Sequence, residues 1–351
     1  MSPPGRPKGE FPLGGTARSA KGAPVSPRKN VVVFRALPED LLARIAAQHE
    51  VVVADPRRVE EVPYFREALR AAHGLIGSSV KLGAADLAEA TSLEVISSIS
   101  VGVDNYDLAY LKRCGVTLCH TPGVLTETTA DTLFGLVMLA SRRFVELSNH
   151  VREGRWTRNI GEELFGWDVH GKTLGILGFG RIGQALARRA AFGFGMPVAY
   201  YDPFDVKVPD LAGHVRHLPF DDVLAQADIV ALTLPLSEAT HGLIGGREFG
   251  LMKPGAIFVN GSRGAIVQES ALLAALDSGG LRAAALDVFA VEPLPLDSPL
   301  RTHPKVTPLP HVGSATHETR RRMAELATDN LLQALAGSRP ACAYDLSRVA
   351  V

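Results

Sequence analysis

The sequence predicts an α/β protein made of two doubly wound parallel-sheet domains with a cleft between them. The chain has 351 residues, which exceeds the length of one average domain. Short aliphatic runs alternate with helical segments of about ten residues, and this series stops once and restarts at Lys172. Strands that alternate with helices form parallel sheets. Each right-handed crossover returns the chain to the end of the sheet where the previous strand began, so the next strand runs in the same direction.

The composition excludes several functional classes. The 37 basic and 37 acidic residues give a formal net charge of zero, which removes the sequence-level case for a nucleic acid or an anionic membrane as partner. Three cysteines without CxxC spacing argue against a disulfide framework and against a structural zinc site. No His, Asp or Glu cluster has metal-ligand spacing, so no metal is predicted. There is no run of 18 apolar residues, so we expect no membrane span.

Residues 1–29 are predicted to form a disordered tail. They contain six Pro, five Gly, six Lys or Arg and one acidic residue, Glu10. Such a segment cannot bury enough apolar surface to order itself. It also lacks the apolar core of a secretory signal, so we expect a cytoplasmic protein.

The first series of strands and helices covers residues 30–121. Its predicted strands are aliphatic runs, and its predicted helices carry apolar residues at helical spacing. The expected strands are 31–35, 51–55, 74–78, 94–101 and 116–120. The expected helices are 38–50, 64–73, 84–90 and 107–114.

Pro122 ends this series, and a long helix over 126–153 is expected to connect it to the second. A last helix over 318–336 follows the second sheet and is free to pack back on the first. We therefore predict one domain of 30–121 with 312–345 and another of 122–311. The expected strands of the second series are 174–177, 198–202, 228–234, 256–260, 283–288 and 306–309.

A G-x-G-x-x-G motif formed by Gly178, Gly180 and Gly183 lies between the strand 173–177 and a helix expected over 182–191. In this context the first glycine permits a tight turn, the second lets a pyrophosphate approach the backbone, and the third lets helix and strand pack closely. The free N–H groups at the start of the helix favour phosphate. A glycine-rich turn without a ligand is the alternative, but the context favours a Rossmann-like dinucleotide site.

The next strand ends at Asp202, nineteen positions after Gly183. An acid there accepts hydrogen bonds from an adenosine ribose 2′-OH and repels a 2′-phosphate. None of residues 203–206 is basic, and Lys207 is the first cation. The sequence therefore predicts NAD(H) as the preferred cofactor, with NADP(H) as the alternative. Asp202 followed by Pro203 is also a common start of a turn, and both roles can hold together.

Three later strands run into Arg263, Glu292 and His311. Guanidinium, carboxylate and imidazole at neighbouring strand ends suit the reduction of a 2-keto acid. The guanidinium binds a carboxylate or carbonyl with two parallel hydrogen bonds, and an imidazolium donates a proton to the carbonyl oxygen. A carboxylate beside an imidazole favours its protonated form. Taken singly, each has an ordinary alternative: a surface arginine, a turn at Glu292-Pro293, or one of eleven histidines.

These segments resemble the D-isomer-specific 2-hydroxyacid dehydrogenase family. The resemblance runs from about residue 74 to 335 and rests on GFGRIG, NGSRG, LDVFAVEP, PHVGSATHETR, SISVGVDNYD and HTPGVLTETTADT. Within the family, VLTETTADT and GSATHETR are most similar to the glyoxylate/hydroxypyruvate reductases that also reduce 2-ketogluconate. The resemblance implies an oxidoreductase that acts on CH–OH donors. Its substrate would be a small 2-keto acid (glyoxylate, hydroxypyruvate or 2-ketogluconate), which it reduces to the D-2-hydroxy acid.

The resemblance also implies roles for individual residues. Arg263 orients the substrate, His311 donates the proton and Glu292 pairs with His311. The family's cleft closes by domain rotation, and its members pair as homodimers through the cofactor domain and its long helix. Besides the three glycines, the implied cofactor contacts are Thr129, Arg181, Ile182, Asp202, Ser262, Asp287 and Gly313. The implied contacts of the substrate carboxylate are backbone groups at Val80, Lys81 and Gly102.

Two questions stay open at this stage. Members closest to this branch often carry a neutral residue and nearby arginines after the second cofactor strand, which favours NADPH, whereas this chain has Asp202. A weakly catalytic NAD-binding sensor or co-repressor on the same fold is the alternative function, although the complete Arg263, Glu292 and His311 set argues against it. Formate- and phosphite-type dehydrogenases share the architecture as well.

Overall fold

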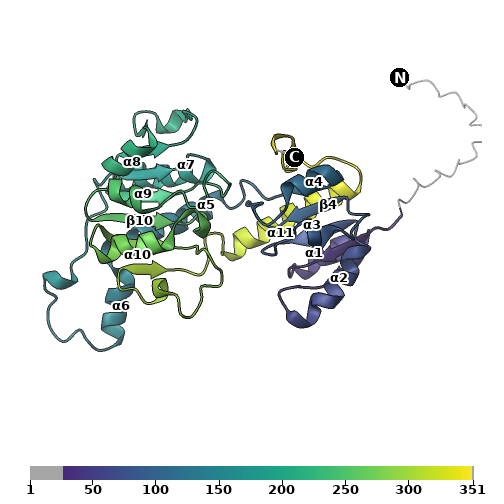
Figure 1. Cartoon of the computed structure of the whole chain (residues 1–351), viewed down its shortest axis with the longest axis horizontal. Helices are drawn as coiled ribbons and strands as arrows, with labels where there is room; N and C mark the ends of the chain where they lie inside the picture. Colours follow the sequence, from purple (N-terminus) through teal and green to yellow (C-terminus); the bar gives the residue numbers. More distant parts are fainter. Residues whose placement is uncertain (1–26, 350–351) are drawn as a thin grey trace, which may run out of the picture.

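The computed structural model describes residues 27–349, and its strands form two parallel sheets (Figure 1). The predicted disordered tail, 1–29, lies outside the described residues except for its last three positions. Within the described range, no helix has the length and apolar character that crossing a membrane requires.

The first sheet has five strands in the order β2-β1-β3-β4-β5. Alternate residues of a strand face opposite sides, so Val31 and Val33 join one core while Val32 and Phe34 join the other. The strands are β1 (Asn30–Val33), β2 (Glu50–Val53), β3 (Gly74–Gly77), β4 (Val95–Ser98) and β5 (Thr117–Cys119). The helices are α1 (Glu39–Ala46), α2 (Val62–Arg70), α3 (Ala84–Leu87) and α4 (Leu108–Cys114).

The second sheet has seven strands in the order β12-β11-β10-β9-β6-β7-β8. Helices α5 and α7 cover one face, and α8, α9 and α10 cover the other. The strands are β6 (Leu174–Leu177), β7 (Val198–Tyr201), β8 (Val215–His217), β9 (Ile229–Leu232), β10 (Ala256–Asn260), β11 (Leu281–Leu286) and β12 (Val306–Pro308). The helices are α5 (Thr126–Arg142), α7 (Arg181–Arg188), α8 (Phe220–Gln226), α9 (Gly246–Leu251) and α10 (Glu269–Asp277).

The last long helix, α11 (His317–Leu335), lies on the first sheet (Figure 1). Its buried residues Met323 and Leu331 share a core with Val31 and Val33, and the Ser97 hydroxyl donates to the Ala327 carbonyl at 2.7 Å. The chain therefore passes between the sheets twice. We propose 121/122 and 311/312 as the domain boundaries at these crossings.

The single helix expected over 126–153 is wrong. Arg143 has φ +57°, in the left-handed region, and ends α5 at Arg142; a second helix, α6, starts at Phe144 and ends at Arg152. The Arg143 side chain holds this break by donating to Glu146 and to the carbonyls of Glu163 and Phe165. A helical hydrophobic pattern continues across one left-handed residue, so the pattern does not reveal the break.

Two smaller differences concern the second sheet. The helix expected over 182–191 is α-helical only to Arg188 and ends in a π-helical turn, Arg189–Gly193. The edge strand β8 was not predicted, because it has three residues and two of them, Arg216 and His217, are polar. Neither difference alters the carboxyl edge of the sheet, where the predicted site residues lie.

Candidate active site

The glycine-rich loop follows β6 and leads into α7, as its spacing predicts. Gly178 has φ +94°, and a Cβ there would lie 2.9 Å from the backbone of Thr233. A Cβ on Gly183 would lie 2.4 Å from the Gly178 carbonyl oxygen. A Cβ on Gly180 would meet no atom within 4 Å. The loop is thus tightly packed on the protein side and open at its middle glycine, which suits the approach of a phosphate.

The Asp202 carboxylate lies beside this loop. Its Oδ2 accepts a hydrogen bond from the Phe179 N–H at 2.9 Å, and its Oδ1 accepts one from the Phe204 N–H at 3.2 Å. The first cation after it, Lys207, forms an ion pair with Asp205 instead. An open glycine backbone at a helix start with a carboxylate next to it fits a dinucleotide.

The two residues that begin α7 differ in their surroundings. The Arg181 side chain is exposed, and its predicted contact with pyrophosphate stays a prediction. Ile182 is half-buried and packs against one core from each sheet. The glycine-rich loop therefore lies where the two sheets meet.

Three adjacent strands of the second sheet supply the predicted reactive side chains. β10, β11 and β12 are neighbours in the sheet and run parallel. Arg263 follows β10, Glu292 follows β11 and His311 follows β12. Their common edge is where ligands bind in open parallel sheets.

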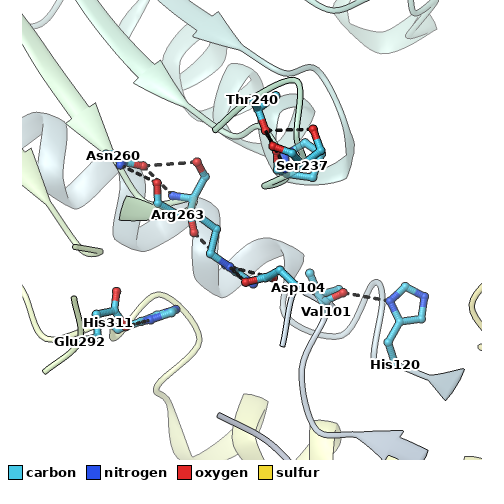
Figure 2. A network of polar contacts seen from close by, with 11 residues as sticks. Val101, Asp104, His120, Ser237, Thr240, Asn260, Arg263, Glu292 and His311 are labelled. Carbon is cyan, nitrogen blue, oxygen red and sulfur yellow. Dashed lines mark hydrogen bonds and ion pairs between the residues drawn. The ribbon is translucent and has the colours of Figure 1, made fainter. Parts of the chain in front are cut away.

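His311 and Glu292 form a close pair (Figure 2). The His311 Nδ1 lies 2.7 Å from Glu292 Oε2, and Glu292 Oε1 accepts a hydrogen bond from the Phe289 N–H at 3.0 Å. Burial opposes ionisation of Glu292, but the hydrogen bonds from His311 and Phe289 and the positive charges of His311 and Arg263 together hold the pKa of this carboxyl below its ordinary value. Because Nδ1 is engaged, Nε2 is the ring nitrogen left to act on a ligand.

Asp287 supports the loop that carries His311. Its carboxylate is buried and accepts hydrogen bonds from the N–H groups of Val312, at 2.7 Å, and Gly313, at 2.8 Å. Burial raises the pKa of Asp287, and these two donors oppose the rise. His311 itself has φ +54°, so the backbone turns sharply here. Both Asp287 oxygens serve the loop, and a direct contact of Asp287 with cofactor stays a prediction.

Thr129 reaches the same loop from α5. A Cβ placed on Gly313 would lie 3.5 Å from the Thr129 Cγ2 and 3.1 Å from an oxygen of Asp287. Helix α5 therefore lies directly behind the His311 loop. The structure brings Thr129, Asp287 and Gly313 together, and their contact with one ligand stays a prediction.

A short turn after β10 presents Arg263. The Asn260 side chain holds this turn, since its Oδ1 accepts from the Ser262 N–H at 3.0 Å and its Nδ2 donates to the Arg263 carbonyl at 3.1 Å. The Arg263 Nε lies 3.1 Å from each carboxylate oxygen of Asp104, which belongs to the loop after β4 (Figure 2). Sequence reasoning missed both Asn260 and Asp104. The available signal for Asp104 was an acid within SISVGVDNYD, two residues after the predicted Gly102.

The residues predicted to hold the substrate carboxylate are brought together only in part. Gly102 lies against Arg263, because a Cβ there would fall 1.7 Å from the Arg263 Nη2. Val80 is half-buried and Lys81 is exposed. Their loop is tied to the Asp104 loop, since the Leu82 N–H donates to the Asn105 carbonyl at 2.9 Å. The side-chain hydrogen bonds of Arg263 go to Asp104 and to the Ser262 carbonyl, and the role of the Val80 and Lys81 backbone stays a prediction.

The part of the chain that the structure describes contains no group of three or more His, Cys, Asp or Glu residues placed to hold a metal ion. The polar groups at the carboxyl edge are instead paired with one another. The chemistry that the predicted reactive side chains offer is that of the Arg263 guanidinium and of the His311 imidazole supported by Glu292.

Comparisons with a family model and with individual known proteins point to the same family. The family model of the D-isomer specific 2-hydroxyacid dehydrogenase NAD-binding domain matches residues 134–313. A protein of Klebsiella pneumoniae (strain 342) named glyoxylate/hydroxypyruvate reductase B is 49% identical over 311 residues, which covers 89% of this chain and 96% of that protein.

Solved structures with the same fold include two reductases. A glyoxylate reductase from Paecilomyes thermophila superposes with a TM-score of 0.82 at 27% identity and covers 92% of this chain and 100% of its own. An NADPH-dependent glyoxylate/hydroxypyruvate reductase from Sinorhizobium meliloti, in complex with NADP and malonate, superposes with a TM-score of 0.80 at 29% identity. The superposition covers 93% of this chain and 100% of that one.

Proposed function

The chain belongs to the D-isomer specific 2-hydroxyacid dehydrogenase family, and on that basis we propose that it reduces glyoxylate and hydroxypyruvate with a nicotinamide cofactor. The relative at 49% identity carries the name of that activity. The observation that carries the proposal is the 2.7 Å pair of His311 and Glu292, which lies on the same sheet edge as Arg263. We include 2-ketogluconate as a third substrate to be tested.

The side chains divide the chemistry between them. A reduced nicotinamide, when bound, would supply the hydride that the keto carbon accepts. Arg263 binds the carboxylate or carbonyl of the acid through its guanidinium. His311 donates a proton from Nε2 to the carbonyl oxygen, which becomes the hydroxyl of the product. Glu292 accepts the Nδ1 hydrogen bond and thereby fixes the ring and stabilises the imidazolium.

We propose that the three glycines, Arg181 and Ile182 hold the pyrophosphate, and that NAD(H) is preferred over NADP(H). The support for the preference is local. Asp202 lies beside the glycine-rich loop, and a carboxylate there repels a 2′-phosphate. The nearest cation in sequence, Lys207, is paired with Asp205. The relative from Sinorhizobium meliloti is NADPH-dependent, so the preference has to be measured on this chain.

The cofactor preference is tested by kcat/KM for glyoxylate with each dinucleotide. We expect NADH to be favoured at least about tenfold, since one charge-assisted hydrogen bond contributes about 1.5–3 kcal/mol. The double variant Asp202→Ser, Pro203→Arg supplies a phosphate partner and should narrow or reverse the ratio. Equal values in the unmodified enzyme would show that Asp202 does not face the ribose.

We propose that the enzyme is a homodimer. Exposed apolar side chains gather on α6 and on the segment that follows it, which is where a partner copy would bury them. They are Phe144, Val145, Val151, Trp156, Ile160 and Phe165. Sedimentation equilibrium should give twice the chain mass, and a Trp156→Glu, Phe165→Glu variant should shift it toward one chain.

The alternative of a weakly catalytic NAD-binding sensor is disfavoured. The relatives described above are named as reductases, and Arg263, Glu292 and His311 are all present. A sensor needs to bind the dinucleotide but has no need of a proton donor paired with a carboxylate. Measured turnover of a 2-keto acid distinguishes a reductase from a sensor that only binds the dinucleotide.

The proposed function is tested by steady-state assays with glyoxylate, hydroxypyruvate and 2-ketogluconate, each with NADH and NADPH. We expect kcat/KM of about 10⁴ M⁻¹s⁻¹ or more for at least one of the first two, which is the lower end of ordinary enzymes. Tight dinucleotide binding without turnover of any of the three acids would support the sensor instead. Formate and phosphite in the oxidative direction complete the screen.

A further inference from the structure

We infer that Asp104 is a positioning residue that orients the Arg263 guanidinium for the substrate, an inference that rests on the proposed function. Asp104 belongs to the loop after β4 in the first sheet, and Arg263 to the turn after β10 in the second. The two are 159 positions apart in sequence, and their side chains meet across the junction of the two sheets (Figure 2).

The contacts of Arg263 leave one nitrogen for a ligand. Nε lies 3.1 Å from both Asp104 oxygens, and Nη1 donates to the Ser262 carbonyl at 2.8 Å. Nη2 has no hydrogen-bond partner among residues 27–349, and it lies against Gly102. Asp104 therefore binds the guanidinium at Nε, the nitrogen attached to the methylene chain. Nη2 is left facing Gly102, which belongs to a predicted substrate loop.

This division of the guanidinium has an energetic reason. An arginine side chain has four rotatable bonds, and ordering them for a ligand costs rotamer entropy. A carboxylate bound to Nε orders the arginine side chain in the free enzyme, so less entropy is lost when the substrate binds. The Asp104 side chain is 24% exposed and that of Arg263 is 27% exposed, so the pair is shielded more than an ordinary surface ion pair.

The Asp104 loop is itself fixed from two sides. The His120 Nδ1 lies 3.0 Å from the Val101 carbonyl oxygen, which ties the loop to the end of β5. The next residue after Asp104, Asn105, accepts a hydrogen bond from the Leu82 N–H and so links the loop to residues 80–82. Asp104 thus connects the predicted substrate loops of the first sheet to the arginine of the second.

A double-mutant cycle tests the inference. Asp104→Ala, Arg263→Ala and the double variant are assayed with glyoxylate at saturating NADH, and oxamate binding in the presence of NADH completes the cycle where turnover is slow. We expect Asp104→Ala to lower kcat/KM and oxamate affinity at least tenfold. In the Arg263→Ala background the same change should alter both less than twofold, because the group that Asp104 orients is gone.

Two further measurements separate positioning from folding. Asp104→Asn keeps one acceptor for Nε and should recover at least threefold of the lost kcat/KM. The Kd for NADH and the Tm of Asp104→Ala should stay close to those of the matched control Glu89→Ala, which removes the exposed carboxylate paired with Arg70 at 2.6 Å.

Several results would overturn the inference. Equal losses for Asp104→Ala in both backgrounds would mean that it acts independently of Arg263. A rise in kcat/KM would mean that Asp104 competes with the substrate carboxylate for the guanidinium. An unmodified enzyme that reduces no 2-keto acid contradicts the proposed function itself, whereas an active enzyme with an additive cycle contradicts only the role of Asp104.

Discussion

At the scale of single residues, the reactive side chains are predictable because each follows a recognisable strand. Arg263, Glu292 and His311 lie in the loops that follow three strands, and parallel strands bring their carboxyl ends to one edge. Asp104 was not predictable in the same way. Its partner lies on the other sheet, and nothing in the spacing of one strand reports what another sheet places opposite it.

Arg263→Lys tests whether the planar guanidinium is required. An ammonium is a single point charge and cannot bind Asp104 through one nitrogen while presenting another to the substrate. We expect kcat/KM for glyoxylate to fall at least about 100-fold, which is about 2.7 kcal/mol, with losses in both kcat and KM. If only the Kd for NADH changed, Arg263 would belong to the cofactor site.

Glu292→Gln tests the carboxylate–imidazole pair. The Glu292 carboxylate lies 2.7 Å from the His311 Nδ1 and places a negative charge beside the ring, which an amide does not supply. We expect kcat for glyoxylate to fall at least about tenfold, while the Kd for NADH changes little. A kcat equal to that of the unmodified enzyme would contradict the role of the pair.

The same pair gives a stability prediction whose sign is set by the lowered pKa of Glu292. A carboxyl whose pKa is lower in the folded state stabilises the fold above its ordinary pKa, about 4.3. That contribution is lost as the pH falls through the lowered value. Glu292→Gln should therefore cost more stability at pH 7 than at pH 3, as measured by urea unfolding. An equal cost at both pH values would show that the ionised form is not the one stabilised.

At the scale of elements, aliphatic strands and the glycine-rich loop are predictable, because burial and positive φ leave direct marks on the sequence. The break at Arg143 and the edge strand β8 are not. Arg143 is an ordinary residue in a left-handed conformation, and its hydrogen bonds to Glu163 and Phe165 come from a segment twenty residues away. Tertiary contacts of this kind override a continuous helical pattern.

Two glycines of one loop should respond differently to alanine. A Cβ on Gly183 meets the Gly178 carbonyl at 2.4 Å, whereas a Cβ on Gly180 meets nothing of the protein within 4 Å. Gly183→Ala should therefore lower the Tm by several degrees and weaken NADH binding. Gly180→Ala should keep the Tm and raise the Kd for NADH at least tenfold, because its methyl group enters the space proposed for phosphate. A Gly180→Ala variant that binds NADH normally would place the phosphate elsewhere.

At the scale of the whole molecule, the two sheets divide the work. The second sheet carries the glycine-rich loop, the His311–Glu292 pair and Arg263, while the first supplies Gly102 and Asp104. Alternation of strands and helices predicts both sheets. It does not predict how the Arg263 side chain meets the first sheet, because that depends on side chains from residues 159 positions apart.

The most direct measurement is the kcat of His311→Gln with glyoxylate, taken together with its Kd for NADH. Glutamine keeps polarity and approximate size but cannot donate the proton, and general acid catalysis contributes about 10²–10⁴-fold. We expect kcat to fall by at least about 100-fold, while the Kd for NADH stays within a factor of about three, a change of under 1 kcal/mol. A kcat close to that of the unmodified enzyme would contradict the assignment of His311 as the proton donor, and with it the proposed reduction at this site.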